Sequence, residues 1–325
     1  MYQPAVCAHP YYDASQQTSN DSDVQSLIAT SMEWTMPDIT FGLATESRSP
    51  YDARLTRAVD GDTVDVVQPV RMVSIDTPEK AEYAGAPPVA QAKLDRCRQR
   101  LLDGTYEALP EPLRQYLVER ITPDAAQRHI AASARAAEEF AKMRRARLEP
   151  VPDGQQPKVA VIVTGDVLDE NGRLLAYVAP WLKAPLPHRD DPRRRTFNLE
   201  MVENGWAALF MIYPSLPTDD DFNRALFAAE QAWAQKRGAW NEFGNDLLLG
   251  YEYRACIKLG AADNPASPIP PAARITEAFR RICVDIRNHT ILGRYGYHYI
   301  DPPYRLWIWQ QDLYRAQDVL RLRDK

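Results

Sequence analysis

Charged side chains that could hold a cation beside a phosphate occur in three short runs of the sequence. The runs are Val59-Asp-Gly-Asp-Thr-Val64, Arg71-Met-Val-Ser-Ile-Asp-Thr-Pro-Glu79 and Asn171-Gly-Arg-Leu-Leu-Ala-Tyr177. Hard cations prefer oxygen ligands, and a planar guanidinium matches the oxygens of a phosphate. Two carboxylates near an arginine at the end of a strand are therefore better suited to binding a cation and a phosphate than to stabilising a fold.

The second run has the clearest geometry. Strand alternation places Arg71, Val73 and Ile75 on one face of the strand. The chain then leaves the sheet, and Pro78 stiffens the exit, which fixes the directions of Asp76 and Glu79. The run thus predicts two carboxylates held at a strand end, close to one arginine.

The other two runs could reach the same point. Asp62 follows a glycine in a tight turn on the neighbouring strand and could share a cation with Asp76, while Arg173 begins a later strand. Each run has an ordinary explanation when taken alone, because Asp-Gly-Asp is usually a turn and Asp-Thr-Pro-Glu usually a helix start. Their joint occurrence, in order and on predicted strands, favours a functional site.

Short β-branched segments and longer amphipathic segments must position these residues. The predicted strands are 53–58, 63–67, 70–75, 158–163 and 174–178, and the predicted helices lie within 80–147, 197–204 and 218–236. This order is typical of a five-stranded Greek-key barrel of the OB type. We therefore expect an α+β protein with a mostly β core, flanking helices, a helical insertion and a C-terminal extension.

The composition divides the chain into three parts. Residues 1–50 read as a polar, loosely ordered arm, with one short helix around residues 23–32. Residues 51–245 carry the predicted barrel, with the helical insertion at about 80–130. Residues 246–325 form an extension rich in aromatic residues and arginine, which could recruit a partner protein, as could the insertion.

Taken together, the three runs resemble the staphylococcal nuclease family. The resemblance covers roughly residues 51–245 and extends to Asn198, to Gly205-Trp-Ala207 and to Arg237-Gly-Ala-Trp240. It implies an OB-fold phosphodiesterase that cleaves DNA, RNA or both and leaves 3′-phosphates. The alternative is a non-catalytic OB-fold module that binds nucleic acid or recruits a partner, although such a module has no reason to retain all five charged side chains.

The resemblance also implies a role for each site residue. Asp62, Asp76 and the carbonyl of Thr77 resemble calcium ligands, and oxygen ligands of this kind would also accept magnesium or manganese. Glu79 resembles the residue that orients or deprotonates the attacking water. The remaining two residues, Arg71 and Arg173, resemble the pair that neutralises the phosphate in the transition state.

The sequence departs from the family pattern at several places. Residues from Lys80 to about Arg128 are inserted beside the predicted site, where they either gate substrate or decorate the surface. Of the two tyrosines that line the substrate pocket in the family, one is replaced by Met211 and the other is retained as Tyr213. These changes concern substrate binding and leave the predicted chemical centre intact.

Composition excludes several other classes of protein. The balance of 39 basic and 44 acidic residues disfavours a protein that only coats nucleic acid. The four cysteines form no Cys-x-x-Cys pair, and the five histidines have no metal-ligand spacing. No signal peptide and no apolar run of about 20 residues is visible, so we expect a cytoplasmic protein with no membrane partner.

The aromatic residues of the extension have two possible roles. They could form a platform on which bases stack, or the core of a small subdomain, and the core is the commoner use of such density. The spacing of Leu306, Trp309, Leu313 and Leu320 predicts a helix laid against the barrel.

Overall fold

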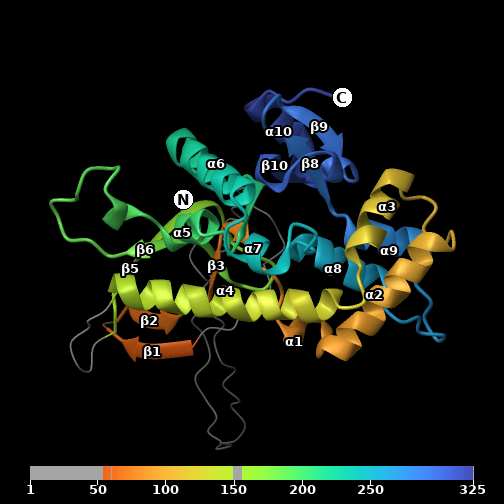
Figure 1. The fold of residues 1–325 in the computed structure, drawn as a ribbon. Coiled ribbons are helices and arrows are strands. Elements are labelled where there is room, and N and C mark those ends of the chain that lie inside the picture. The colour runs from red at the N-terminus through yellow and green to blue at the C-terminus, as the bar shows by residue number, and fades with distance from the viewer. Residues whose placement is uncertain (1–53, 60, 149–155, 325) are drawn as a thin grey trace, which may run out of the picture. The chain divides into compact units, whose positions relative to one another are not determined.

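The predicted strands form three separate sheets. The computed structural model describes residues 54–59, 61–148 and 156–324, so the N-terminal arm and its expected helix lie outside the described residues (Figure 1). The first sheet is the antiparallel pair β1 (Arg54–Ala58) and β2 (Val64–Val67). The second has the order β3 (Val70–Met72), β6 (Leu174–Pro180) and β5 (Val159–Leu168).

The third sheet joins the predicted barrel region to the C-terminal extension. Its order is β4 (Ser74–Asp76), β7 (Ala208–Tyr213), β10 (Arg305–Trp309), β8 (Arg281–Asp285) and β9 (Thr290–Gly293). Strand β7 pairs with β4 on one edge and with β10, in parallel, on the other. The proposed boundary at residue 245 stays a prediction, and residues on both sides of it contribute to this one sheet.

A closed barrel is not present among the described residues. The orders β1-β2 and β3-β6-β5 are consistent with an OB fold, but β2 does not pair with β3, nor β1 with β5, in the described parts of the chain. The strand expected over residues 70–75 also divides in two. Ser74 has a positive φ of 61°, so the chain turns after Val73, and β4 pairs with β7 while β3 stays with β6.

Helices occupy the insertion, the flanks and the extension. Their bounds are α1 (Ala81–Ala84), α2 (Pro87–Leu102), α3 (Glu111–Arg120), α4 (Ala125–Leu148), α5 (Phe197–Glu203), α6 (Asp219–Ala234), α7 (Ala239–Phe243), α8 (Gly250–Leu259), α9 (Pro271–Ala278) and α10 (Leu313–Leu320), with short 3-10 turns at Pro192–Arg194, Gly296–Tyr299, Pro302–Tyr304 and Gln310–Asp312. Helix α5 begins where expected, because the Thr196 hydroxyl accepts a hydrogen bond of 3.1 Å from the backbone N–H of Leu199.

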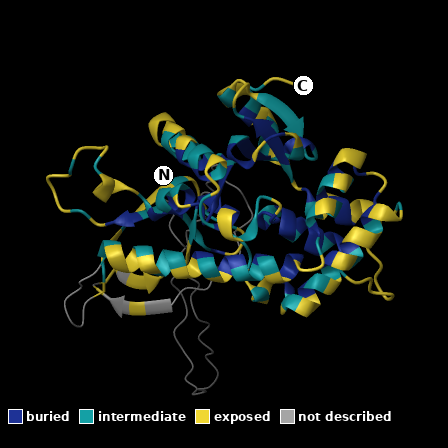
Figure 2. Ribbon diagram, viewed as in Figure 1, coloured by how far each residue is buried: buried dark blue, intermediate teal, exposed yellow. Residues whose placement is uncertain are grey.

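The insertion and the extension share one hydrophobic core. Leucines on the inner faces of α2 and α3 pack with Tyr253, Cys256 and Leu259 of α8 and with Trp307 of β10. Figure 1 shows α2 beside α8, and Figure 2 shows that the surfaces they turn toward each other are buried. The insertion is therefore a structural support for α8.

The aromatic residues of the extension are mostly core, as the sequence favoured. Tyr297 and Trp307 are almost fully buried and pack against Tyr251 and Phe210. The helix predicted from Leu306 onward is wrong in its first half. Residues 305–309 form β10, which is buried between β7 and β8, and the α-helix covers residues 313–320 after a 3-10 turn at 310–312.

The three described cysteines, Cys97, Cys256 and Cys283, are buried and free. Among the helices in the described part of the chain, none is both long enough and apolar enough to cross a membrane.

Candidate active site

Asp76 lies at the centre of the site, at the end of β4, and is almost completely buried. Its Oδ1 accepts hydrogen bonds of 3.1 Å from Arg71 and from Arg254, and its Oδ2 accepts a third, also of 3.1 Å, from Arg254. Burial opposes ionisation of this carboxyl, but the charges of Arg254 and Arg71 outweigh it and hold the pKa of Asp76 below its usual value. Asp76 is therefore a carboxylate fixed between two guanidiniums.

Glu79 lies three residues after Asp76, in the irregular segment before α1, and shares the same arginine. Its Oε1 makes a close ion pair with Nη1 of Arg254. The backbone N–H of Glu79 donates to Nε2 of His129, at 2.7 Å. Both the side chain and the backbone of Glu79 are thus held by residues outside the Asp-Thr-Pro-Glu run.

His129 is a positioning residue on α4. Its ring stacks on Tyr253 with centroids 3.8 Å apart, and Nδ1 lies 3.0 Å from the carbonyl oxygen of Leu248. Burial lowers the pKa of His129 to about 3, so the imidazole is neutral, donates from Nδ1 and accepts at Nε2. It links the Glu79 backbone to the segment that precedes α8.

The turn before Arg173 orients its guanidinium. Asp169 Oδ1 accepts the backbone N–H groups of Asn171 and Arg173 at 2.9 Å, and Oδ2 accepts Nε of Arg173 at 2.7 Å. The Arg173 side chain remains 42% exposed. The guanidinium is therefore oriented by Asp169 and still accessible to a ligand.

One cavity of about 610 Å³ brings several of these side chains together. Arg71, Glu79, Arg173 and Tyr213, all predicted from the sequence, lie on its wall. The wall also includes residues that the sequence analysis did not select: Tyr83, Asp169, Phe210, Arg254, Arg281 and Trp309. The cavity combines several guanidiniums with carboxylates, among them Glu79 and Asp169, and with aromatic faces. Binding and hydrolysing a nucleotide phosphodiester would use groups of these kinds.

Four predicted residues do not line this cavity. Asp76 borders a small separate pocket beside Gly250. Asp62 is exposed in the turn between β1 and β2, where it accepts a hydrogen bond of 3.1 Å from the Thr63 hydroxyl. Met211 is buried and borders another cavity, beside Tyr177. Thr77 borders a third cavity, next to Glu79. Their roles as metal ligands or substrate contacts stay predictions.

The described residues do not form a site that fits a calcium ion. Both oxygens of Asp76 are bonded to guanidiniums, and no group of three His, Cys, Asp or Glu residues in the described chain could hold a metal. Gly250, the first residue of α8, also closes this space. A methyl group on Gly250 would overlap Oδ2 of Asp76 and lie 2.7 Å from the Thr77 carbonyl oxygen.

Arg254 and Arg281 are the functional candidates that sequence reasoning missed. Arg281 of β8 lies against the ring of Trp309, 4.1 Å from its centroid, and its buried Nε has no hydrogen-bond partner among the described residues. Burial, with repulsion from Arg254, lowers the pKa of Arg281 to about 10, so it is a cation at neutral pH. A partly buried cation on a cavity wall that forms no ion pair within the described part of the chain is a candidate for binding an anion.

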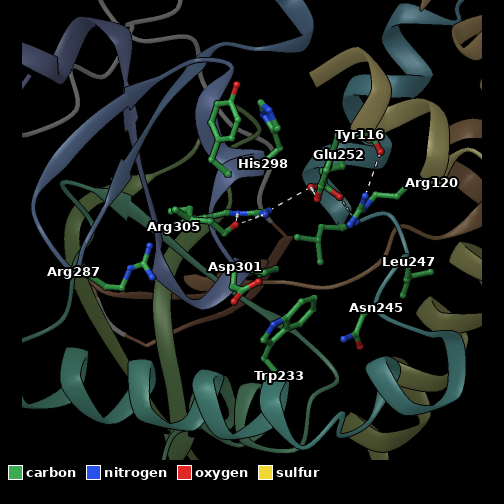
Figure 3. Close-up of a pocket in the computed structure, with 14 residues that line it drawn as sticks. Tyr116, Arg120, Trp233, Asn245, Leu247, Glu252, Arg287, His298, Asp301 and Arg305 are labelled. Carbon is green, nitrogen blue, oxygen red and sulfur yellow. Dashed lines mark hydrogen bonds and ion pairs between the residues drawn. The ribbon is translucent and has the colours of Figure 1, made fainter. Parts of the chain in front are cut away.

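A buried network fixes the first turn of α8, and therefore the position of Arg254. Glu252 Oε2 accepts the backbone N–H of Leu249 at 3.0 Å, and Oε1 accepts the Tyr116 hydroxyl at 2.7 Å and Nη1 of Arg305 at 3.3 Å. Arg305 also donates to the carbonyl oxygen of Ile300, at 2.7 Å. Figure 3 shows this network along a small cavity of about 200 Å³, between the insertion, α8 and the C-terminal strands.

The last turn of α8 is held by the insertion. Nε of Arg96 donates to the Gly260 carbonyl oxygen at 2.9 Å, while Arg100 and the Tyr106 hydroxyl donate to the Leu259 carbonyl oxygen at 2.8 and 2.6 Å. These donors satisfy carbonyls that a helix end leaves without partners. Both ends of the helix that carries Arg254 are thus fixed.

Guanidiniums around a cavity and a buried carboxylate beside it are groups that enzymes acting on phosphate esters use. The family described as staphylococcal nuclease homologue matches residues 69–242, just over half of the chain. The chain belongs to this family. The match begins after Asp62 and ends before α8, so it includes Arg71, Glu79 and Arg173 but not Arg254 or Arg281.

A curated relative supports the same assignment. Endonuclease YhcR of Bacillus subtilis (strain 168) is 25% identical over 177 residues, which is 54% of this chain and 14% of that protein. The chain therefore spans a small part of the length of that relative. The likeness agrees with the family match. Members of the family depend on calcium in general.

Proposed function

We propose that the chain hydrolyses single-stranded DNA or RNA in the 610 Å³ cavity and leaves a 3′-phosphate and a 5′-hydroxyl. The observation that carries the proposal is the meeting of Arg71, Glu79 and Arg173 on one cavity wall, although they come from separate segments of the chain. A cavity of this size lies in the range of small-ligand pockets, about 300–1,000 Å³, which accommodates nucleotide units rather than a duplex.

In the proposed reaction, each of the three side chains has a distinct task. The Glu79 carboxylate accepts a proton from a water molecule while the water oxygen attacks phosphorus. The bond between phosphorus and the 5′ oxygen then breaks, and the leaving oxygen takes a proton from solvent. Arg71 and Arg173 donate to the phosphate oxygens, whose charge is greatest in the transition state, where fixed donors stabilise most.

Aromatic and cationic groups on the same wall support binding of the nucleotide. Tyr213 and Trp309 border the cavity where a base would lie, and the Nε of Arg281 has no partner among the described residues, a partner that a neighbouring phosphate would supply. Arg281→Ala should therefore weaken binding, seen as a raised KM and a smaller salt dependence of affinity, with a smaller effect on kcat.

The test is cleavage of end-labelled single-stranded DNA, duplex DNA and RNA by the wild-type chain and by Glu79→Gln. We expect single strands to be cut faster than duplex, and the variant to lose about 10²–10⁴ in rate, the usual contribution of a general base. Phosphatase treatment of the products should change the mobility of the 3′ ends. Full activity in Glu79→Gln, or products with 5′-phosphates, would contradict the proposal.

A further inference from the structure

Arg254 stands where the sequence pattern places a metal ion. Its guanidinium contacts both carboxylates of the Asp-Thr-Pro-Glu run, with two hydrogen bonds of 3.1 Å to Asp76 and a close ion pair to Glu79. It also lines the cavity that holds Arg71 and Arg173. A single positive group thus bridges the carboxylates that would otherwise need a cation between them.

We propose that Arg254 replaces the divalent cation and acts as a catalytic residue, so that this nuclease cleaves phosphodiesters without a divalent metal. The proposal rests on the proposed function, since it concerns the same cavity and the same reaction. In the described structure the Nε–H and one Nη2–H of Arg254 have no partner, which leaves two donors for the oxygens of a substrate phosphate.

The anchoring of α8 argues that Arg254 belongs in this position. The first turn is held through Glu252 of α8, which Tyr116 and Arg305 contact, and the last turn by Arg100 and Tyr106 of the insertion. Gly250 lets the helix start close against Asp76 and Thr77, where any larger residue would collide. A guanidinium held in this way needs no reorganisation when charge develops on the phosphate, which is the condition under which a fixed cation stabilises a transition state most.

A guanidinium can take over the electrostatic task of the cation but not all of its chemistry. It can neutralise the phosphate oxygens as water attacks, and it does not lower the pKa of a bound water as a metal does. The proton of the attacking water must therefore go to Glu79, and the 5′ oxygen leaves with the electron pair of the broken bond. Arg254 changes neither its bonds nor its charge in this step.

The first experiment measures cleavage of a fluorescent single-stranded DNA by the full chain in excess chelator and in millimolar calcium. We expect rates within about threefold of each other and no calcium-induced shift of the melting temperature. Cleavage that appears only with calcium, together with a saturable rise in melting temperature, would overturn this inference and leave the proposed function standing. No cleavage by folded protein in either condition would overturn both.

The second experiment replaces Arg254. Arg254→Ala should lose at least about 100-fold in kcat with and without calcium, in line with the loss of one fixed donor. Arg315→Ala, on the exposed side of α10, serves as the matched control and should be unchanged. Millimolar guanidinium should restore part of the activity of Arg254→Ala and not that of Arg71→Ala.

The variants also distinguish an Arg254 that replaces the cation from an Arg254 that only covers a metal site. If Arg254 only covered a metal site, Arg254→Ala would cleave faster than the wild type in calcium and would bind calcium by calorimetry. That result would overturn the inference. Arg254→Lys, which keeps the charge and loses the planar fork, should fold like the wild type and show intermediate activity, so a folding defect in Arg254→Ala does not decide the question.

Discussion

The backbone N–H of Glu79 donates a hydrogen bond of 2.7 Å to Nε2 of His129, a side chain with no exposed surface. The bond exists only while the imidazole is neutral, because a protonated ring has no acceptor. The carboxylate that we propose as the general base is therefore positioned by a buried group that must not be charged.

The first prediction concerns stability at acid pH. The pKa of His129 is about 3 in the folded chain and about 6.5 in an unfolded one, so the unfolded state binds the extra proton between these values. The stability that the neutral ring contributes is complete above pH 6.5 and falls as the pH decreases toward 3. At about 1.4 kcal/mol per pH unit, we expect a loss of about 2 kcal/mol between pH 6.5 and pH 5.

The measurement is urea unfolding of the wild type and of His129→Gln at pH 7 and pH 5. Glutamine keeps one donor and one acceptor but does not titrate, so it removes this contribution from the pH dependence. Between pH 7 and pH 5, the free energy of unfolding of the wild type should fall by about 2 kcal/mol more than that of the variant. Equal losses would show that His129 is not the buried neutral group described above.

The second prediction separates activity from stability at Arg173. Its side chain is 42% exposed and pairs with Asp169, which keeps its bonds to two backbone N–H groups when the arginine is removed. Arg173→Ala should lose about 10²–10³ in kcat. Its free energy of unfolding should change by no more than about 0.5 kcal/mol, as is usual for an exposed ion pair. Turnover close to that of the wild type would remove Arg173 from the site.

The third prediction tests the support that the insertion gives to α8. A methyl group on Gly260 would overlap the backbone carbonyl of Lys93 in α2, which cannot move aside as a flexible side chain could. Gly260→Ala should therefore cost about 1–3 kcal/mol of stability. Activity should fall as well, because the last turn of the helix that carries Arg254 would shift.

Gly61→Ala is the matched control for stability, since a methyl group there meets no atom within 4 Å. Denaturant midpoints of both variants and the cleavage rate of Gly260→Ala provide the measurement. A Gly260→Ala variant as stable and as active as the wild type would show that α2 does not hold α8 in place.

The fourth prediction concerns the buried pair of Glu252 and Arg305. Both side chains are almost completely buried, so Arg305→Met leaves a carboxylate without its counter-charge. We expect Arg305→Met to lower the free energy of unfolding by about 3–5 kcal/mol. Adding Glu252→Gln should recover part of that loss, because the second change removes the stranded charge. If the loss of stability in the double variant equalled the sum of the losses in Arg305→Met and Glu252→Gln measured separately, this account would be contradicted.

Much of the β structure could be predicted because its signals are local. The segments that became β1, β2, β5 and β6 are short, β-branched and bounded by turn residues, so neighbouring positions alone were enough. The same holds for Arg71, Glu79 and Arg173, which lie at turns and strand ends within recognisable runs. Their meeting in one cavity follows from the order of those strands.

The remaining features depend on contacts that a linear pattern does not encode. Arg254 is 178 residues from Asp76, and no periodicity links them. Residues 305–309 were predicted as helix because Leu306 and Trp309 are three positions apart, a spacing that a strand buried on both faces also allows. Predicting β10 as a strand required knowing that an edge of β7 was open to it.

The distance between Asp76 and Arg254 along the chain also sets the order in which the enzyme becomes competent during its synthesis. A ribosome completes the runs around Asp76 and Arg173 well before it reaches α8, and β10 follows about fifty residues later still. Until those segments emerge, Asp76 and Glu79 lack the guanidinium that bridges them, and β7 lacks its partner β10. We expect the nascent chain to remain inert beside the messenger RNA that encodes it until α8 and β10 have left the ribosome.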